Sequence, residues 1–449
     1  MAKITLKQAA LWCGGSVDEK YEDVEFFGAN NDTRVLREGQ LFIVLQGARD
    51  GHDFIPAAMD RGAAAVLCSR RVGDYPAIYV QDPRTALGRI AREHLKQLGC
   101  KVVGVTGSVG KSTTKEMISA VLETAYRVSK TPANHNNDIG MPMAILAMGE
   151  DTQVAVLEMG MNHFREIAYL AEIARPDVGV IINVGTMHIE YLGSREGIRK
   201  AKMEITEGMA PDAPLLLNGD NDLLRNLDEI PAQPITYFGT GENCAVRARN
   251  VVQEEGKLSF RVLTPEEEFS VNLALEGEHY VSDALAAAAV GLKLGVSTEK
   301  IAGALGAFQN ISGRQEIYRA GEYTIINDCY NAGPESMAAA LNVLGARKGR
   351  KIAVLGDMLE LGNCAWAEHF KLGRIAAGKA DILFVYGPHA QRVAEGAAIG
   401  GKTSAEVAVF TDHGDLAAAL KLVAKPGDTL LFKGSRGMHM EISLEKFLK

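Results

Sequence analysis

The sequence lacks three features that would assign it to a broad class at once: a long apolar run, clustered cysteines and an excess of positive charge. No stretch approaches the roughly 18 consecutive apolar residues that span a bilayer, and residues 1–8 hold two lysines but no apolar signal-peptide core. We therefore expect no membrane segment and a cytoplasmic location. The net charge of −8 argues against general nucleic-acid binding.

The cysteines are widely spaced along the chain. They are Cys13, Cys68, Cys100, Cys244, Cys329 and Cys364. None belongs to a Cys-x-x-Cys pair or lies near a histidine at zinc-ligand spacing. We expect free thiols throughout.

The length and the apolar runs indicate several α/β units. At 449 residues the chain is too long for one ordinary core. Short β-branched runs alternate with helical patterns, and they occupy residues 102–107, 154–158, 178–183, 215–218, 351–356, 382–387 and 429–433. Runs buried on both faces are typical of a parallel sheet covered by helices. We predict two such domains, one central and one C-terminal.

The remaining segments complete a three-domain α/β protein. Residues 41–45 and 64–67 are apolar runs among short helices and turns, which favours a small N-terminal domain. Alternating sequence between residues 245 and 275 predicts an antiparallel ribbon on the central domain, before an alanine-rich helix near residues 283–293. The predicted domains are residues 1–98, 99–312 and 313–449.

The strongest local signal is a glycine-rich turn between an apolar strand and the helical pattern at residues 113–122. It reads Thr106-Gly107-Ser108-Val109-Gly110-Lys111-Ser112. Backbone N–H groups of such a turn surround phosphates, Lys111 reaches the terminal phosphates, and the Ser112 hydroxyl can bind magnesium. Val105 stands where the standard pattern has glycine, so the turn is a shortened variant. Its strand and helix context favours a phosphate loop over an ordinary turn.

Three further residues follow strands of the same predicted sheet. Glu158 ends the strand at residues 154–158, so it should lie beside the phosphate loop, where a carboxylate suits magnesium. The alternative is a carboxylate that only caps the next turn. His188 follows the next strand, and Lys202 lies in a helix predicted at residues 196–209. From the residues alone, a turn histidine and a solvated lysine explain these two better.

Polar loops supply other candidates. In the first loop, the amide side chains of Asn134 and Asn136 can donate and accept hydrogen bonds. In the second, Asp328 and Asn331 could hold ribose or adenine. The third contains Lys433, Ser435 and Arg436, whose cations could clamp a carboxylate or phosphate. Each group is also compatible with an ordinary turn or a surface basic pair.

Taken in order, these strings resemble the Mur ligase family over nearly the whole chain. The resemblance is carried by Lys202 and by residues 106–115, 134–142, 157–163, 183–188, 313–314, 328–334, 355–362 and 433–441. It implies a substrate-nucleotide domain, a central ATPase domain with a phosphate loop, and a Rossmann-like C-terminal domain that closes over the site. It also implies an ATP-dependent ligase that forms a peptide bond through an acyl phosphate in peptidoglycan precursor synthesis.

The resemblance implies roles for individual residues. Ser112, Glu158, His188 and a carbamate on Lys202 would bind two magnesium ions. The catalytic residues would be Lys111, Lys202, His188 and Arg314. ATP would contact Gly107, Ser108, Val109, Gly110, Lys111, Ser112, Thr113, Asn137, His279, Arg314, Asp328 and Asn331.

Within the family, residues 31–34, 39–42 and 47–54 resemble the uridine pocket of the branch that joins D-alanyl-D-alanine to UDP-N-acetylmuramoyl-tripeptide. The resemblance implies a monomer with these two substrates as its partners and with no nucleic-acid or membrane partner. The implied substrate-binding residues are Thr33, Arg34, Gly47, Asp50, Gly51, His52, Asn134, Asn136, Lys433, Ser435 and Arg436.

The chain departs from the family pattern at three positions near the expected nucleotide. Tyr280 and Asp283 replace two asparagines, one of which helps to hold adenine. Gly333 stands where the family often has asparagine. We expect the chemistry to be kept and the contacts to the base to differ.

Overall fold

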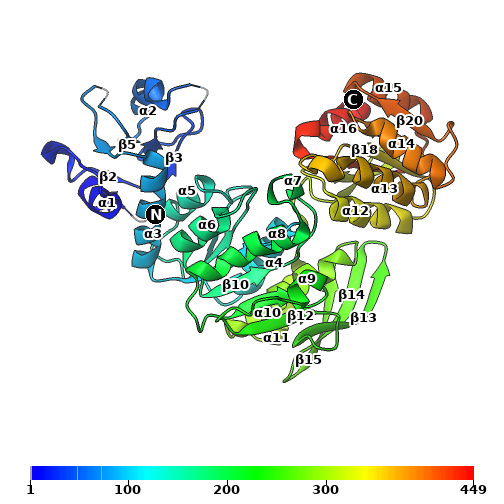
Figure 1. Cartoon of the computed structure of the whole chain (residues 1–449), viewed down its shortest axis with the longest axis horizontal. Coiled ribbons are helices and arrows are strands. Elements are labelled where there is room, and N and C mark those ends of the chain that lie inside the picture. The colour runs from blue at the N-terminus through cyan, green and yellow to red at the C-terminus, as the bar shows by residue number, and fades with distance from the viewer. Residues whose placement is uncertain (1–2, 48, 72) are drawn as a thin grey trace.

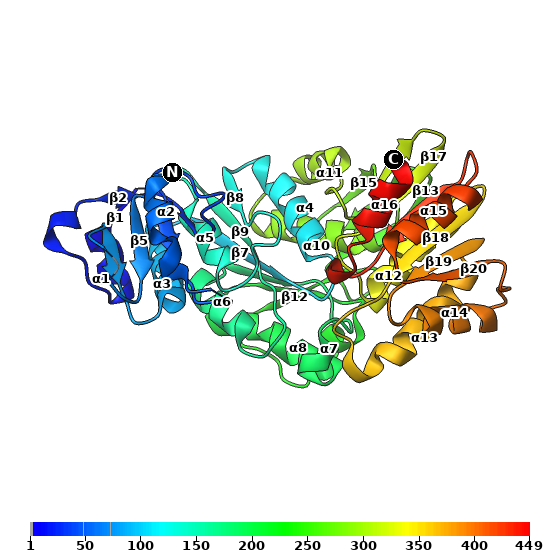
Figure 2. The same ribbon diagram turned by 90° about the horizontal axis from the view of Figure 1, so that it is seen from above.

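The structure is a computed structural model that describes residues 3–47, 49–71 and 73–449. Over these residues the strands form four sheets. The sheets belong to three bodies in a curved row, with the central body between the other two (Figures 1 and 2). The predicted α/β class is confirmed.

The N-terminal body combines a two-stranded pair with a parallel sheet of order β3-β4-β5-β6. Helix α3 leads from this body to the central one, and apolar residues around it form one continuous core with one face of the central sheet. The elements are β1 (Ile4–Thr5), α1 (Leu6–Cys13), η1 (Glu19–Tyr21), β2 (Glu25–Phe26), β3 (Ala29–Asn30), β4 (Leu41–Ile43), η2 (Gly51–Phe54), α2 (Ile55–Asp60), β5 (Ala65–Cys68), β6 (Ala77–Tyr79) and α3 (Pro83–Leu98).

The central body is built on a sheet of order β15-β14-β13-β12-β11-β10-β7-β9-β8. Its pairs are parallel from β8 to β13, and β13, β14 and β15 form the predicted antiparallel ribbon. The elements are β7 (Lys101–Thr106), α4 (Lys111–Glu123), β8 (Val128–Lys130), α5 (Gly140–Leu146), β9 (Val154–Glu158), α6 (Glu166–Ala174), β10 (Val178–Ile181), α7 (Ile189–Leu192), α8 (Arg195–Met203), η3 (Glu204–Gly208), β11 (Leu215–Asn218), α9 (Asp222–Arg225), β12 (Ile235–Gly239), β13 (Val246–Glu254), β14 (Lys257–Leu263), β15 (Glu268–Leu273), α10 (His279–Lys293) and α11 (Thr298–Ala307).

The two faces of the central sheet are covered by different helices. Apolar residues of α4, α10 and α11 pack with the ribbon on one face, and those of α5, α6 and α8 pack on the other. The predicted helix at residues 196–209 is shorter than expected, because α8 ends at Met203 and the 3-10 turn η3 follows. Glu204 holds this turn by accepting hydrogen bonds from the backbone N–H groups of Arg165 (2.8 Å) and Ala168 (3.2 Å).

The C-terminal body has a sheet of order β16-β17-β21-β18-β19-β20, parallel except for β16. Helices α12, α13 and α14 cover one face, and α15 and α16 cover the other, which is the Rossmann-like arrangement that the resemblance implied. The elements are β16 (Glu316–Ala320), β17 (Tyr323–Asp328), α12 (Pro334–Ala346), β18 (Lys351–Gly356), η4 (Gly362–Cys364), α13 (Ala365–Ala377), β19 (Ile382–Tyr386), α14 (Ala390–Ile399), β20 (Val407–Phe410), α15 (His413–Val423), β21 (Thr429–Lys433), η5 (Arg436–Met438) and α16 (Met440–Leu448).

Two expectations drawn from composition also bear on the structure. The cysteines are free thiols, as predicted. Within the described part of the chain, no helix combines the length and the apolar character needed to cross a bilayer.

Candidate functional site

A cavity of about 920 Å³ lies between the central and C-terminal bodies. The carboxyl ends of β7, β9 and β10 meet beside it, because Thr106 pairs with Ile181 and Val105 pairs with Glu158. Most of the predicted site residues line this cavity. They are Ser108, Val109, Gly110, Lys111, Ser112, Thr113, Asn134, Asn136, Asn137, Glu158, His188, His279, Arg314, Asp328, Asn331 and Lys433.

The glycine-rich turn has a fixed backbone at the start of α4. Gly110 takes a left-handed conformation (φ 84°), which glycine adopts at low cost. The Asn183 side-chain oxygen accepts hydrogen bonds from the backbone N–H groups of Ser108 and Val109, both at 3.0 Å. Lys111 Nζ donates to the carbonyl of Gly107 at 2.8 Å. A glycine-rich turn with a half-buried lysine at a helix N-terminus is the arrangement typical of a phosphate site.

Glu158 lies beside this loop, as the strand order predicted. Its Oε2 accepts a 2.8 Å hydrogen bond from the Ser112 hydroxyl, and its Oε1 accepts one of 2.8 Å from the Asn136 side chain. Lys115, which the sequence strings included without a role, is buried with Nζ 3.8 Å from Oε2. The carboxylate is therefore oriented on both oxygens by residues of the cavity.

Lys202 is buried rather than solvated, so the simpler interpretation from sequence is wrong. Its residue exposure is 2%, and among the described residues no hydrogen bond or ion pair reaches its amine. Burial, and then the charge of Lys111, lowers the pKa of Lys202 well below the ordinary value. An amine with a lowered pKa is less protonated and therefore more nucleophilic near neutral pH.

Two charged side chains, Glu158 and Arg314, shift the pKa of Lys111 in opposite directions. Burial lowers the pKa of Lys111, Glu158 raises it, and Arg314 lowers it further. Arg314 itself lies over the ring of Tyr330, 3.9 Å from the ring centre. The cavity thus combines Lys111 and Arg314 from opposite bodies.

The two residues of α10 that stand in place of the family's asparagines, Tyr280 and Asp283, both form side-chain hydrogen bonds. Tyr280 accepts a 2.6 Å hydrogen bond from the Asn310 side chain. Asp283 accepts one of 2.7 Å from the Thr114 hydroxyl, and burial raises the pKa of Asp283 to about 7. His279 precedes them at the start of α10 and is exposed.

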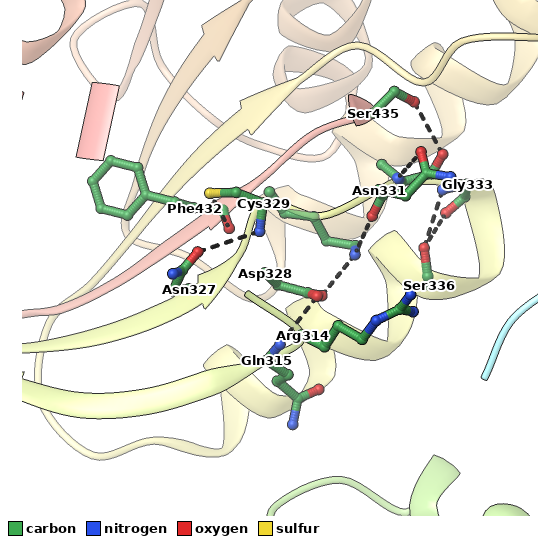
Figure 3. A network of polar contacts seen from close by, with 12 residues as sticks. Arg314, Gln315, Asn327, Asp328, Cys329, Asn331, Gly333, Ser336, Phe432 and Ser435 are labelled. Atoms are coloured by element: carbon green, nitrogen blue, oxygen red, sulfur yellow. Dashed lines mark hydrogen bonds and ion pairs between the residues drawn. The ribbon is translucent and has the colours of Figure 1, made fainter. Parts of the chain in front are cut away.

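The loops of the C-terminal body are tied to one another (Figure 3). Asp328 accepts hydrogen bonds from the backbone N–H of Gln315 (3.1 Å) and from Lys433 Nζ (2.6 Å), and Lys433 also donates to the Asn331 carbonyl (2.9 Å). Ser435 is buried, and its hydroxyl donates a hydrogen bond to the carbonyl of Ala332. Lys433 is therefore neutralised by Asp328 within the cavity wall.

Several predicted residues do not line the cavity: Gly107, Lys202, Ser435, Arg436, Thr33, Arg34, Gly47, Asp50, Gly51 and His52. The last six lie in the N-terminal body. There, a carboxylate oxygen of Asp50 lies 2.6 Å from His52 Nδ1, and Asp50 also forms an ion pair with Arg70 at 2.5 Å. Arg34 forms an ion pair with Asp32 on the exposed surface. The structure therefore separates them from the phosphate loop.

Sequence reasoning missed the contacts between the two bodies. Glu335, at the start of α12, accepts hydrogen bonds from the backbone N–H (2.9 Å) and hydroxyl (3.1 Å) of Thr186. Glu360 Oε2 lies 2.5 Å from His188 Nδ1. Glu360 belongs to a string that carried the family resemblance, and this was the signal that could have marked it.

The other end of α12 is bonded to the central body as well. Arg347 follows its last turn and pairs with Glu276 at 2.5 Å and with Glu255 at 2.9 Å. Arg347 and Glu276 have side-chain exposures of 9% each, so this is a largely buried ion pair. Helix α12 is therefore held at both ends.

Comparison with known proteins gives matches over nearly the whole chain. Residues 105–291 match the Mur ligase middle domain, and residues 313–436 match the family described as "Mur ligase, glutamate ligase domain". A protein of Bacillus subtilis (strain 168) named UDP-N-acetylmuramoyl-tripeptide--D-alanyl-D-alanine ligase is 42% identical, over 98% of this chain and 97% of its own. The protein of that name from Escherichia coli (strain K12) is 34% identical, over 98% and 97%.

Solved structures of proteins named MurF are also similar to this chain. A crystal structure of MurF from Acinetobacter baumannii has a TM-score of 0.92 at 32% identity, and covers 100% of this chain and 99% of that chain. MurF ligase from Thermotoga maritima in complex with ADP has a TM-score of 0.83 at 31% identity, with coverage of 94% and 97%.

Proposed function

The chain belongs to the Mur ligase family, and we propose that it joins D-alanyl-D-alanine to UDP-N-acetylmuramoyl-tripeptide with ATP. The reaction gives the pentapeptide precursor of peptidoglycan, ADP and phosphate. The observation that carries this conclusion is the 42% identity to a ligase of that name, which extends over 98% of the chain and so includes the N-terminal body. The phosphate loop and the cavity between the bodies supply the geometry.

The chemistry proceeds in two steps. The terminal carboxylate of the tripeptide attacks the γ-phosphorus of ATP; the new O–P bond forms as the β–γ bridging P–O bond breaks, and ADP leaves. The amine of D-alanyl-D-alanine then attacks the carbonyl carbon of the acyl phosphate; the C–N bond forms, phosphate leaves and the amine loses a proton. Both partners of the first step are anions, so catalysis depends on charge neutralisation and alignment.

Lys111 and Arg314 are suited to that neutralisation. Lys111 lies at the start of α4, where the backbone N–H groups of the loop face phosphate oxygens in such sites. Arg314 approaches from the linker to the C-terminal body, and its guanidinium is placed by stacking on Tyr330. We assign the nucleoside part of ATP to the side of the cavity with His279, Asp328 and Asn331.

The residues of the cavity also fit magnesium, and Lys202, which is buried and does not line the cavity, fits a carbamate. Glu158 and Ser112 present oxygen atoms of the kind that magnesium prefers, and His188 lines the same cavity. Among the residues described, no cluster of three or more His, Cys, Asp or Glu side chains could hold a metal ion unaided. A carbamate on Lys202 and the phosphates of ATP would complete the ligands, and bound magnesium would offset the charge between carboxylate and phosphate. The Lys202 amine is buried, has no hydrogen-bond or ion-pair partner among the residues that the structure describes, and is suited to react with carbon dioxide.

We further propose that the bodies have separate tasks within residues 1–98, 99–312 and 313–449. The first would hold the uridine nucleotide through Thr33, Arg34, Gly47, Asp50, Gly51 and His52. The second would hold ATP, and the third would close over the cavity with Lys433, Ser435 and Arg436 near the substrates. Separate sheets in the three ranges support this division. Free cysteines suit a cytoplasmic enzyme, which we propose acts as a monomer.

The test is phosphate release by the purified protein with ATP and magnesium, with each substrate alone and with both together. We expect release only with both, and a product with the mass of the pentapeptide. Release without an amine acceptor would indicate a kinase-like or hydrolytic enzyme instead. Release with a folate and glutamate would indicate a folylpolyglutamate synthetase.

A further inference from the structure

The C-terminal body contributes a carboxylate to a histidine of the cavity. Glu360 Oε2 lies 2.5 Å from Nδ1 of His188, although the two residues are 172 positions apart. His188 lines the cavity and precedes α7 of the central body, while Glu360 follows β18 of the C-terminal body. The proposed function uses His188 and gives Glu360 no part.

The segment that carries Glu360 is held firmly in its own body. The backbone N–H of Met358 donates to His369 Nε2 at 3.0 Å, and that of Leu359 donates to the Ser435 hydroxyl at 2.9 Å. Leu361, on the other side of Glu360, is 2% exposed. The carboxylate is thus presented by a supported loop rather than by a free surface chain.

Both members of the pair have unusual backbone conformations. His188 has φ 65° and Glu360 has φ 60°, in the left-handed region that residues with a side chain seldom occupy. Such conformations persist where the surrounding structure holds them, and they are concentrated at functional sites. The contact between His188 and Glu360 is consistent with that pattern.

The loop before His188 is held by the same body. Glu335 accepts the hydrogen bonds of Thr186, and the backbone N–H of Gly185 donates to the Ser108 hydroxyl at 2.9 Å. Residues 185–188 therefore connect the phosphate loop with two glutamates of the C-terminal body.

We propose that Glu360 is a positioning residue for the ligation: it accepts the Nδ1 hydrogen of His188 and thereby fixes the ring with Nε2 free to act in the cavity. This rests on the proposed function. Histidines that bind metal ions commonly donate their other ring N–H to a carboxylate, which sets tautomer and orientation. Because Glu360 comes from the C-terminal body, His188 is oriented only while the two bodies are docked.

The first test is pentapeptide formation by the full-length enzyme at increasing magnesium concentration. It compares the wild type with Glu360→Ala, Glu360→Gln and the control Glu368→Gln, which lies on α13 of the same body away from the cavity. Glu360→Ala should lower kcat or magnesium affinity roughly 10- to 100-fold. Glu360→Gln should lose less, since its amide oxygen still accepts. KM for ATP should change little in all three, and an unchanged kcat and magnesium dependence in Glu360→Ala would overturn the proposal.

The second test measures the imidazole nitrogens of His188 by NMR in enzyme labelled with ¹⁵N-histidine, without metal or substrates. The His188 signals are assigned by their absence in His188→Gln. The wild type should show one tautomer with the hydrogen on Nδ1, and Glu360→Ala should show an average of two. Identical spectra in the two proteins would overturn the proposal. Failure of the wild type to make pentapeptide would instead contradict the proposed function, because the NMR measurement does not depend on it.

Discussion

The hydroxyl of Thr114 on α4 donates a 2.7 Å hydrogen bond to Oδ1 of Asp283 on α10, 169 positions further along the chain. The same oxygen would lie 2.8 Å from a Cβ placed on Gly110, so the carboxyl group also packs against the phosphate loop. One buried acid therefore joins two helices at the point where ATP is expected to bind.

Asp283→Asn should make the protein relatively more stable at alkaline pH. Burial raises the pKa of Asp283 from 3.8 to about 7, so the carboxyl group favours folding below the lower value and this contribution is lost as pH rises towards the higher one. The full loss is at most about 4 kcal/mol. Asparagine cannot ionise. Urea unfolding from about pH 4 to about pH 8 should show the free-energy difference between variant and wild type shifting in favour of the variant.

The matched control for this measurement is Asp222→Asn. Asp222 is only slightly buried and pairs with Arg195, which lowers its pKa, so both proteins should change in parallel over the same pH range. Parallel curves for Asp283→Asn as well would contradict the assigned burial effect.

Lys111→Ala should nearly abolish ligation without unfolding the protein. The lysine faces the terminal phosphates in the proposed complex, and by analogy with loss of one oxyanion donor kcat should fall by about 10² to 10³. Pentapeptide formation and thermal unfolding measure the two effects. Lys96→Ala is the control, because Lys96 is exposed on α3. Near-normal turnover by Lys111→Ala would refute its proposed role.

Lys202 should carry a carbamate when carbon dioxide is present. Its buried amine has a pKa well below the ordinary value, which favours the reactive neutral form. Enzyme equilibrated with ¹³C-bicarbonate should show a carbamate carbon by NMR. The signal should be absent in Lys202→Ala, which should also lose activity by about 10² or more, and present in Lys200→Ala, a substitution at an exposed site on the same helix. A short carboxylic acid should restore part of the lost activity.

Arg347→Ala should destabilise the contact between the central and C-terminal bodies. Removal of one partner leaves Glu276 with a largely buried charge, which typically costs about 3–5 kcal/mol. We expect a lower thermal unfolding temperature, whereas Arg374→Ala at an exposed site on α13 should leave it unchanged. Equal unfolding temperatures for the two variants would show that the ion pair contributes little.

The elements that sequence predicted well are those whose signal is local. The apolar run at residues 429–433 coincides with β21, and the run at residues 154–158 coincides with β9. Glu158 could be placed beside the phosphate loop because parallel strands bring their carboxyl ends to one edge. Periodicity and strand order suffice for such inferences.

The contacts that sequence could not predict join distant segments. Lys433 lines the cavity, and sequence did not indicate that its amine is bonded to Asp328, 105 positions away. Lys202 has the local sequence of a surface helix, and its burial depends on packing between elements. Glu335 and Glu360 are ordinary polar residues by pattern, and their partners are set by how the C-terminal body sits on the central one.

Helix α12 of the C-terminal body lies along the boundary with the central body, and both of its ends are bonded to the central body. Its first turn is bonded to Thr186 and the residue after its last turn to Glu276, about 18 Å apart at the rise of an α-helix. If one end of a rigid helix is released, the helix can move only by rotation about the end that stays bonded. Release at Thr186 would leave Arg347 as the pivot, so a small rotation there would produce its largest displacement at the end beside His188 and the phosphate loop.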